Sequence, residues 1–196
     1  MDILFATNNV HKVREIQSLL PPDLHLITLK EAGLQTEIPE PFETLEENAH
    51  AKIQFALERT GMKAGFSEDS GLFVQALQGR PGVHSAHYAG VHRSDTDNMQ
   101  KVLLEMSGQV DRQAFFQTTI CLVWLERVHF FTGTCEGRIL LTPKGDQGFG
   151  YDPIFQPAAA DKSFADMPLA EKNQYSHRQK AFQQMIRFLQ DEKKSR

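Results

Sequence analysis

The alternation of strand-like and helix-like segments constrains the fold of this chain more than any other feature of its sequence. Apolar runs rich in β-branched and aromatic residues are separated by segments whose apolar residues recur at helical spacing. A capping-box pattern at Thr44 and Glu47 opens the clearest helix, which ends before Gly61. We predict strands at 2–6, 24–29, 64–67, 112–124, 127–135 and 153–156, and further helices at about 10–20, 95–106 and 176–190. Early alternation followed by a β-hairpin predicts an α/β fold with a mixed sheet.

Length, charge and cysteine content narrow the class of protein. The 196 residues fit one compact domain, 1–196, with a frayed tail from about residue 191. The net charge of −4 argues against a nucleic-acid partner but allows a small anionic ligand. Cys121 and Cys135 lack metal-site spacing and are expected to be reduced core residues. No leader and no membrane-spanning apolar run is apparent, so we expect a cytoplasmic protein without a membrane partner.

The first candidate binding segment is the strand-to-helix junction Thr7-Asn8-Asn9-Val10-His11-Lys12. A helix start offers backbone N–H groups and a positive dipole end, where anions bind. Thr and Asn side chains can cap the helix, and Lys12 adds a point charge for a phosphate. The same residues also fit an ordinary capped junction with a surface lysine.

Lys52 is the second candidate, because it shares a helical face with Leu45, Ala49 and Ala56. That apolar face is expected to pack inward, where a lysine is costly unless its ammonium reaches a carboxylate or a bound anion. The alternative is that the stem packs and the amine reaches water.

Carboxylates form the third and fourth candidates. Ser67-Glu68-Asp69-Ser70-Gly71 lies at the end of the strand predicted at 64–67, where a side chain can point into a cleft. One carboxylate there can hold Mg²⁺ or activate a water, and a glutamate of the loop at 37–43 can join it. An acidic turn and a solvated loop are the alternatives.

Two later segments offer groups for a nucleobase. Phe149 and Tyr151 present aromatic faces beside Gly150, and Asp152 can accept hydrogen bonds from ring N–H groups. A tight turn into a strand is the alternative. His177 and Arg178 fall in the first turn of the last helix, where the dipole disfavours cations, so acceptor groups are expected opposite them.

Taken together, these segments resemble the inosine triphosphate pyrophosphatase family. The resemblance rests on four motifs in family order, with support from Glu47-Asn48-Ala49-x-x-Lys52, and covers the chain from Ile3 to about Gln190. The motifs are Thr7-x-Asn9-x-x-Lys12, Glu68-Asp69-Ser70-Gly71, Phe149-Gly150-Tyr151-Asp152 and Lys172-(four residues)-His177-Arg178.

The resemblance implies an elongated mixed α/β domain, with two lobes around a central cleft, that assembles as a homodimer. It implies hydrolysis of ITP, dITP or XTP at the α-phosphorus, releasing pyrophosphate. Asp69 would bind Mg²⁺ and act as general base, and Ser70 would contact substrate beside it. The Thr7–Lys12 turn and Lys52 would hold the triphosphate, while Phe149 to Asp152, Lys172, His177 and Arg178 would hold the base and sugar.

The chain departs from the family pattern at three places. Asn8 stands where many relatives carry glycine, and Glu68 replaces the commoner aspartate. The metal-binding glutamate of the family precedes Thr-Gly, whereas Glu40 precedes Pro41-Phe42. Glu40 is chosen because it lies seven residues before Glu47-Asn48-Ala49, as in the family. Glu37 and Glu43 remain alternatives.

Two other functions compete with this prediction. Stacking on Phe149 or Tyr151 suits any base, so a pyrophosphatase for pyrimidine or modified nucleotides is one. A nucleotide-binding regulatory module without turnover is the other.

Overall fold

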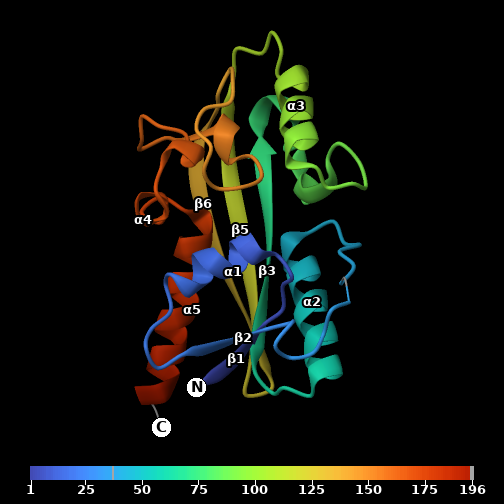
Figure 1. Ribbon diagram of the computed structural model, residues 1–196, viewed down its shortest axis with the longest axis vertical. Helices are drawn as coiled ribbons and strands as arrows, with labels where there is room; N and C mark the ends of the chain where they lie inside the picture. The colour runs from blue at the N-terminus through green and yellow to red at the C-terminus, as the bar shows by residue number, and fades with distance from the viewer. Residues whose placement is uncertain (37, 195–196) are drawn as a thin grey trace. The chain divides into compact units, whose positions relative to one another are not determined.

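The computed structural model describes residues 1–36 and 38–194 (Figure 1). The chain forms two compact units. Unit 1 contains Met1–Asp69, Thr118–Gly133 and the chain from Arg178 onward. Unit 2 contains Ser70–Gln117 and Thr134–His177. Each unit has a buried apolar core of its own.

Within the described residues, seven strands form one mixed sheet in the order β2-β1-β3-β5-β6-β7, with β4 paired to β3. Strand β1 runs parallel to β2 and β3, whereas the β3–β4 and β6–β7 pairs are antiparallel, which confirms the predicted mixed sheet. The strands are β1 (Asp2–Phe5), β2 (His25–Thr28), β3 (Gly65–Val74), β4 (Pro81–Gly82), β5 (Gln113–Trp124), β6 (Arg127–Ile139) and β7 (Phe155–Pro157).

The helices α1, α2, α3 and α5 correspond to the predicted ones, and short helical turns lie between strands. The α-helices are α1 (Val10–Gln17), α2 (Leu45–Thr60), α3 (Asp95–Glu105), α4 (Leu169–Lys172) and α5 (His177–Lys194). The 3₁₀ turns are η1 (Gln75–Leu77), η2 (Ser85–His87), η3 (Asp152–Ile154) and η4 (Phe164–Asp166). No helix among the described residues is long and apolar enough to cross a membrane.

In unit 1 the sheet is covered on both faces, and side-chain alternation along β1 decides what each residue meets. Ile3 and Phe5 pack into a cluster with α1 and α5, whereas Leu4 and Ala6 join a cluster with α2. Figure 1 shows α2 and α5 on opposite sides of the strands. Because both faces are buried, β1 reads as a continuous apolar run rather than an alternating one.

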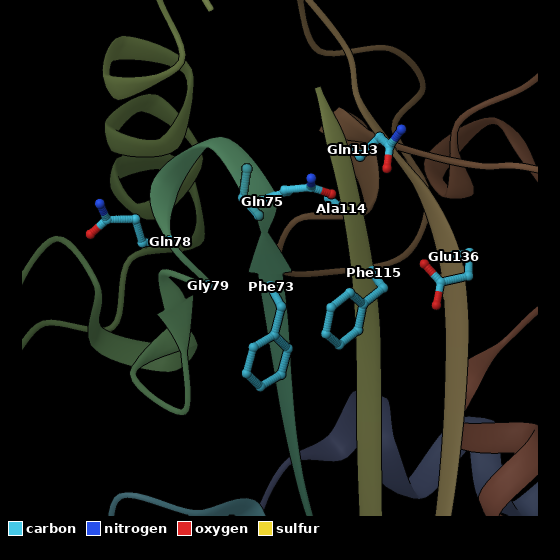
Figure 2. Close-up of a pocket in the computed structure, with 9 residues that line it drawn as sticks. Phe73, Gln75, Gln78, Gly79, Gln113, Ala114, Phe115 and Glu136 are labelled. Carbon is cyan, nitrogen blue, oxygen red and sulfur yellow. The ribbon is translucent and has the colours of Figure 1, made fainter. Parts of the chain in front are cut away.

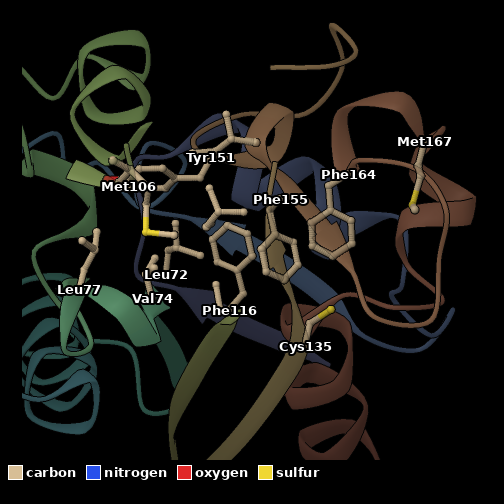
Figure 3. Packing of buried hydrophobic residues seen from close by; sticks show 14 residues of the cluster. Leu72, Val74, Leu77, Met106, Phe116, Cys135, Tyr151, Phe155, Phe164 and Met167 are labelled. Atoms are coloured by element: carbon tan, nitrogen blue, oxygen red, sulfur yellow. The ribbon is translucent and has the colours of Figure 1, made fainter. Parts of the chain in front are cut away.

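In unit 2 a separate cluster packs under β3, β5 and β6 (Figure 3). Leu72, Val74 and Phe116 come from these strands, and Phe155 and Phe164 come from β7 and η4. The rings of Phe116 and Phe155 meet edge to face, with centroids 4.7 Å apart. Both cysteines are free and buried, Cys121 in unit 1 and Cys135 in this cluster, which confirms their predicted core role.

Element boundaries differ from the predicted ones where context overrides local pattern. Helix α1 ends at Gln17 rather than near residue 20, since the residue before Pro21 is disfavoured in the helical region. Strand β6 continues to Ile139, because its last residues pair with β7. Helix α5 continues to Lys194, because two lysines in its last turn interact favourably with the negative end of the helix dipole.

Candidate active site

The acidic motif lies inside strand β3, not at its end as predicted. Strand β3 runs unbroken from Gly65 to Val74, because Phe66, Leu72 and Val74 are all buried in cores. Neighbouring side chains of a strand point to opposite faces. Glu68 therefore meets α1 and α5, while Asp69 meets α2.

On the α1–α5 face, Glu68 is the centre of a buried ion-pair network. Arg178 Nε donates to both carboxylate oxygens of Glu68, at 2.9 and 2.8 Å, and Arg178 Nη1 donates to Glu15 Oε2 at 2.6 Å. Lys12 Nζ lies 3.1 Å from Glu68 Oε1. The cations at Lys12 and Arg178 thus balance the carboxylates of Glu15 and Glu68.

The ion pairs of this network shift the pKa values of Glu68 and Arg178 toward their charged forms. Burial alone would raise the pKa of Glu68, but attraction to Arg178 and Lys12 outweighs it and lowers the pKa. Burial alone would lower the pKa of Arg178, yet Glu68 and Glu15 raise it. The acceptors expected opposite Arg178 are therefore carboxylates of the protein. Nε and Nη1 of Arg178 are the donors engaged with them.

On the α2 face, Asp69 belongs to a second buried cluster. Lys52 Nζ donates to Glu40 Oε1 at 2.5 Å and to Asp69 Oδ1 at 3.3 Å. Asn48 Nδ2 donates to Asp69 Oδ2 at 3.2 Å and also binds the carbonyl of Phe42. Helix α2 positions both side chains, and its predicted cap is confirmed, with Thr44 Oγ1 accepting from the Glu47 N–H. The ammonium of Lys52 contacts carboxylates and does not extend into water, which is the first of the two alternatives given for this inward-facing lysine.

In the Asp69 cluster, the Lys52 ammonium contacts two carboxylates. Burial raises the pKa of Asp69, and Lys52, which lies nearer to Glu40, does not offset it fully. Burial alone would lower the pKa of Lys52, but Asp69 and Glu40 outweigh it and raise the pKa. The lysine is therefore charged, and its ammonium is shared by the two carboxylates.

Carboxylate oxygens held close together suit a hard divalent cation such as Mg²⁺. Among the described residues, Asp69 and Glu40 both contact the Lys52 ammonium, whereas Glu68 pairs with Lys12 and Arg178. Among residues 1–36 and 38–194 there is no group of three or more His, Cys, Asp or Glu side chains that could hold a metal ion. Mg²⁺ commonly takes one or two carboxylates and completes its shell with water and substrate oxygens. Glu43 is exposed, and Glu37 lies outside the described residues.

The Thr7–Lys12 junction is a capped helix start. Asn9 Oδ1 accepts from the N–H groups of His11 and Lys12, and Thr7 Oγ1 accepts from the Asn9 N–H. The predicted capping is confirmed, and it occupies two of the N–H groups that an anion would otherwise bind. Asn8 reaches back to the carbonyl of Thr36, and Val10 is exposed.

In unit 2, Asp152 and Lys172 form a buried ion pair beside Phe149. Lys172 Nζ donates to Asp152 Oδ2 at 2.6 Å, and the Phe149 N–H donates to the same oxygen at 2.9 Å. The ammonium lies 5.2 Å from the centre of the Phe149 ring. The carboxylate predicted to accept from a base thus accepts from its own turn and from Lys172.

His177 and Tyr151 are also fixed within unit 2. The His177 ring stacks on Phe116, with centroids 4.7 Å apart and an interplanar angle of 8°. Tyr151 is buried in the core, and its hydroxyl donates to the Ser85 carbonyl at 2.8 Å. The prediction of an open ring face at Tyr151 is therefore wrong, because the ring fills the core. Ser70 directly follows Asp69 in β3 and is half-buried.

A pocket of about 310 Å³ in unit 2 contains none of the predicted site residues (Figure 2). Phe73 and Phe115 stack on each other in its wall, with centroids 4.9 Å apart. The charged side chain of its lining is Glu136, which would repel a polyphosphate. This pocket is therefore not the candidate active site.

A model of the Ham1 family matches residues 3–188. The chain belongs to the Ham1 family. This membership confirms the resemblance drawn from the four motifs, and the match covers nearly the whole chain.

Several named proteins are similar to this chain in sequence or in structure. A protein of Flavobacterium psychrophilum named dITP/XTP pyrophosphatase is 44% identical over 97% of this chain and 100% of its own length. A protein of the same name from Porphyromonas gingivalis is 43% identical over 95% of this chain and 96% of its own. The Ham1 protein of Staphylococcus aureus has a TM-score of 0.88 at 36% identity and covers 98% of this chain and 100% of its own. The mixed α/β fold is thus that of Ham1 structures.

Three residues of these clusters were not predicted from the sequence. Glu15 gave no signal, because a glutamate in a short helix is usually solvated. Asn48 does share a helix face with Lys52, four residues earlier, and that spacing could have identified it. Phe116 sits in an aromatic strand, where nothing distinguishes it from other core residues.

Proposed function

We propose that this chain is a single pyrophosphatase domain that hydrolyses the non-standard purine nucleotides ITP, dITP and XTP to a monophosphate and pyrophosphate. The name of the relatives from Flavobacterium psychrophilum and Porphyromonas gingivalis supports this substrate class. The observation that carries the proposal is the buried cluster in which Asp69 and Glu40 share the Lys52 ammonium. Displacement at phosphorus needs such charges held in place more than it needs a covalent nucleophile.

We assign Mg²⁺ to Asp69 and Glu40. When bound, the ion neutralises phosphate charge and lowers the pKa of a bound water. Lys52 contacts both carboxylates, so it limits their mutual repulsion and holds them ready for a cation. Asn48 fixes the second oxygen of Asp69 and ties the 40–42 loop to helix α2 through Phe42.

Asp69 is the general base that takes the proton of the attacking water. Burial raises the pKa of this carboxyl, which makes it a stronger base than an exposed aspartate. The proton passes from the water to Asp69 as the oxygen attacks the α-phosphorus. Pyrophosphate leaves, and the monophosphate keeps the oxygen of the water.

Lys12, Lys52 and the Thr7–Lys12 turn bind the triphosphate, with Ser70 next to the base Asp69. Lys12 is suited to this because its side chain is 16% exposed and its ammonium rests on Glu68. A lysine held by one carboxylate can still present its other N–H bonds to a phosphate oxygen. Glu15 and Glu68 hold the Arg178 side chain in place.

Phe149, Gly150, Asp152, Lys172, His177 and Arg178 hold the base and sugar. Donors from Arg178 and loop N–H groups suit O6 of hypoxanthine or xanthine, while adenine presents amino hydrogens there. Leaving a buried donor unpaired costs about 1–3 kcal/mol, so a few such groups discriminate strongly.

We further propose that the protein acts in the cytoplasm as a homodimer. The family resemblance supports the dimer, and the absence of a membrane-spanning helix among the described residues is consistent with this location. Sedimentation equilibrium tests the dimer directly, and a mass of about 22 kDa at micromolar concentration would contradict it.

Hydrolysis assays with and without Mg²⁺ test the proposed function. ITP, dITP, XTP, GTP, ATP and dUTP are compared, and pyrophosphate and orthophosphate are measured separately. In H₂¹⁸O, the label is expected in the monophosphate and not in pyrophosphate. Preference for dUTP would favour a pyrimidine enzyme, and binding of ITP without turnover would favour a regulatory module.

A further inference from the structure

The turn Gly148–Asp152 has little conformational preference of its own. Gly148 and Gly150 flank Phe149, and both have positive φ, 77° and 62°. A Cβ added to Gly148 would lie 2.1 Å from Asp152 Oδ2, so glycine is required there. Two glycines beside one aromatic residue leave the backbone free to rotate unless hydrogen bonds fix it.

Asp152 fixes one side of this turn. Its carboxylate accepts from the Phe149 N–H, and its own N–H donates to the Phe149 carbonyl at 3.2 Å. The N–H of Gly150 is another polar group of the turn, and it belongs to the same peptide unit as the Phe149 carbonyl. The orientation of that peptide therefore depends both on the Asp152 N–H and on what accepts from Gly150.

The acceptor is Asp95, 55 residues away in the sequence. Gly150 N–H donates to Asp95 Oδ2 at 2.7 Å. Asp95 is the first residue of α3, and the cap of that helix is made by Ser94, whose hydroxyl accepts from the Asp97 N–H. The Asp95 carboxylate is thus not needed as the cap of its own helix.

Helix α3, which carries Asp95, is anchored to the neighbouring loop by hydrogen bonds from Asn98. Asn98 Oδ1 accepts from the Ala89 N–H at 2.7 Å, and Asn98 Nδ2 donates to the Ala86 carbonyl at 3.1 Å. The loop held in this way begins next to Ser85, whose carbonyl accepts from the Tyr151 hydroxyl. Burial, with Tyr88 and Asp95 nearby, raises the pKa of Tyr151, which agrees with a carboxylate close to the turn.

We propose that Asp95 is a positioning residue for nucleobase recognition, which holds the Phe149–Gly150 peptide so that Phe149 presents its ring to the base. The inference rests on the proposed function of Phe149. Asp95 does not touch the reacting atoms, so its loss affects binding of the base and not the chemistry at phosphorus. An Asn at this position keeps an oxygen acceptor and preserves the contact.

The test compares Asp95→Ala, Asp95→Asn and the control Asp97→Ala. Asp97 lies in the same first turn of α3 and is exposed, so both Ala variants lose the same dipole interaction. For Asp95→Ala we expect KM for ITP and the inhibition constant of IMP to rise about five-fold, near 1 kcal/mol. The kcat and inhibition by inorganic pyrophosphate stay unchanged, and Asp95→Asn and Asp97→Ala resemble the wild type.

Amide hydrogen exchange at Gly150 provides a readout that does not depend on activity. Exchange is expected to speed up in Asp95→Ala but not in Asp97→Ala. Unchanged exchange, or equal KM values in the two Ala variants, overturns the proposal. A wild-type protein that releases no pyrophosphate from ITP overturns the proposed function instead, and exchange then still decides whether Asp95 holds Gly150.

Discussion

Replacing Asp69 with Asn is expected to reduce turnover and metal binding, while the stability of the metal-free protein stays close to that of the wild type. The change takes one negative charge from a buried cluster that has two carboxylates and one ammonium. Because the pKa of Asp69 is raised in the folded protein, its ionised form costs folding free energy at pH 7, and the amide removes that cost. The amide also turns one NH₂ group toward Asn48 or Lys52, which costs about 1 kcal/mol.

These two effects oppose each other, so Asp69→Asn in EDTA should have a Tm within about 3 °C of wild type. Adding Mg²⁺ to about 100 times its Kd stabilises the wild type by about 2.7 kcal/mol. For a chain of this length that raises Tm by about 5–10 °C. Asp69→Asn should show less than half of this rise, and its turnover of ITP should fall by at least ~10²-fold.

Scanning calorimetry in EDTA and in Mg²⁺ measures both effects. Glu58→Gln serves as the control, since Glu58 is an exposed carboxylate on α2, the helix that carries Asn48 and Lys52. An equal Tm rise in Asp69→Asn and wild type would refute the assignment of the metal to Asp69. If the Tm of Asp69→Asn in EDTA lies more than about 5 °C below that of the wild type, the argument from the raised pKa of Asp69 is refuted.

Three further changes test the remaining parts of the site. Lys12→Ala should weaken ITP binding about ten-fold but IMP binding less, and equal losses by calorimetric titration would contradict its place on the phosphates. Glu15→Gln should lower unfolding free energy by about 2–4 kcal/mol in urea titrations, because Arg178 loses a buried partner, while Glu58→Gln stays near wild type. In the metal-free protein, NMR titration should find the pKa of the Asp69 carboxyl above 3.8, its ordinary value, and a pKa at or below 3.8 would contradict the role of burial. Glu68 contributes stability above its ordinary value of 4.5, which is lost as pH falls through its lowered pKa.

The sequence by itself determined the types of the main helices and strands and supplied the residues proposed to carry the chemistry. Caps, turn residues and apolar spacing are local properties, so the α2 cap and the hairpin followed from the residues alone. The inward placement of Lys52 followed from helical spacing for the same reason. The motifs also identified the family, since their order along the chain needs no coordinates.

Only the tertiary structure decided how the carboxylates are shared among the cations. Whether Glu68 or Asp69 is neutralised depends on which helix covers each face of β3, and that is set by packing between residues distant in sequence. The contacts of Glu15 and Asp95 were also found only in the tertiary structure, because their partners Arg178 and Gly150 lie 163 and 55 positions away in the sequence. Local patterns cannot encode such pairings, since chain folding alone brings the partners within hydrogen-bond distance.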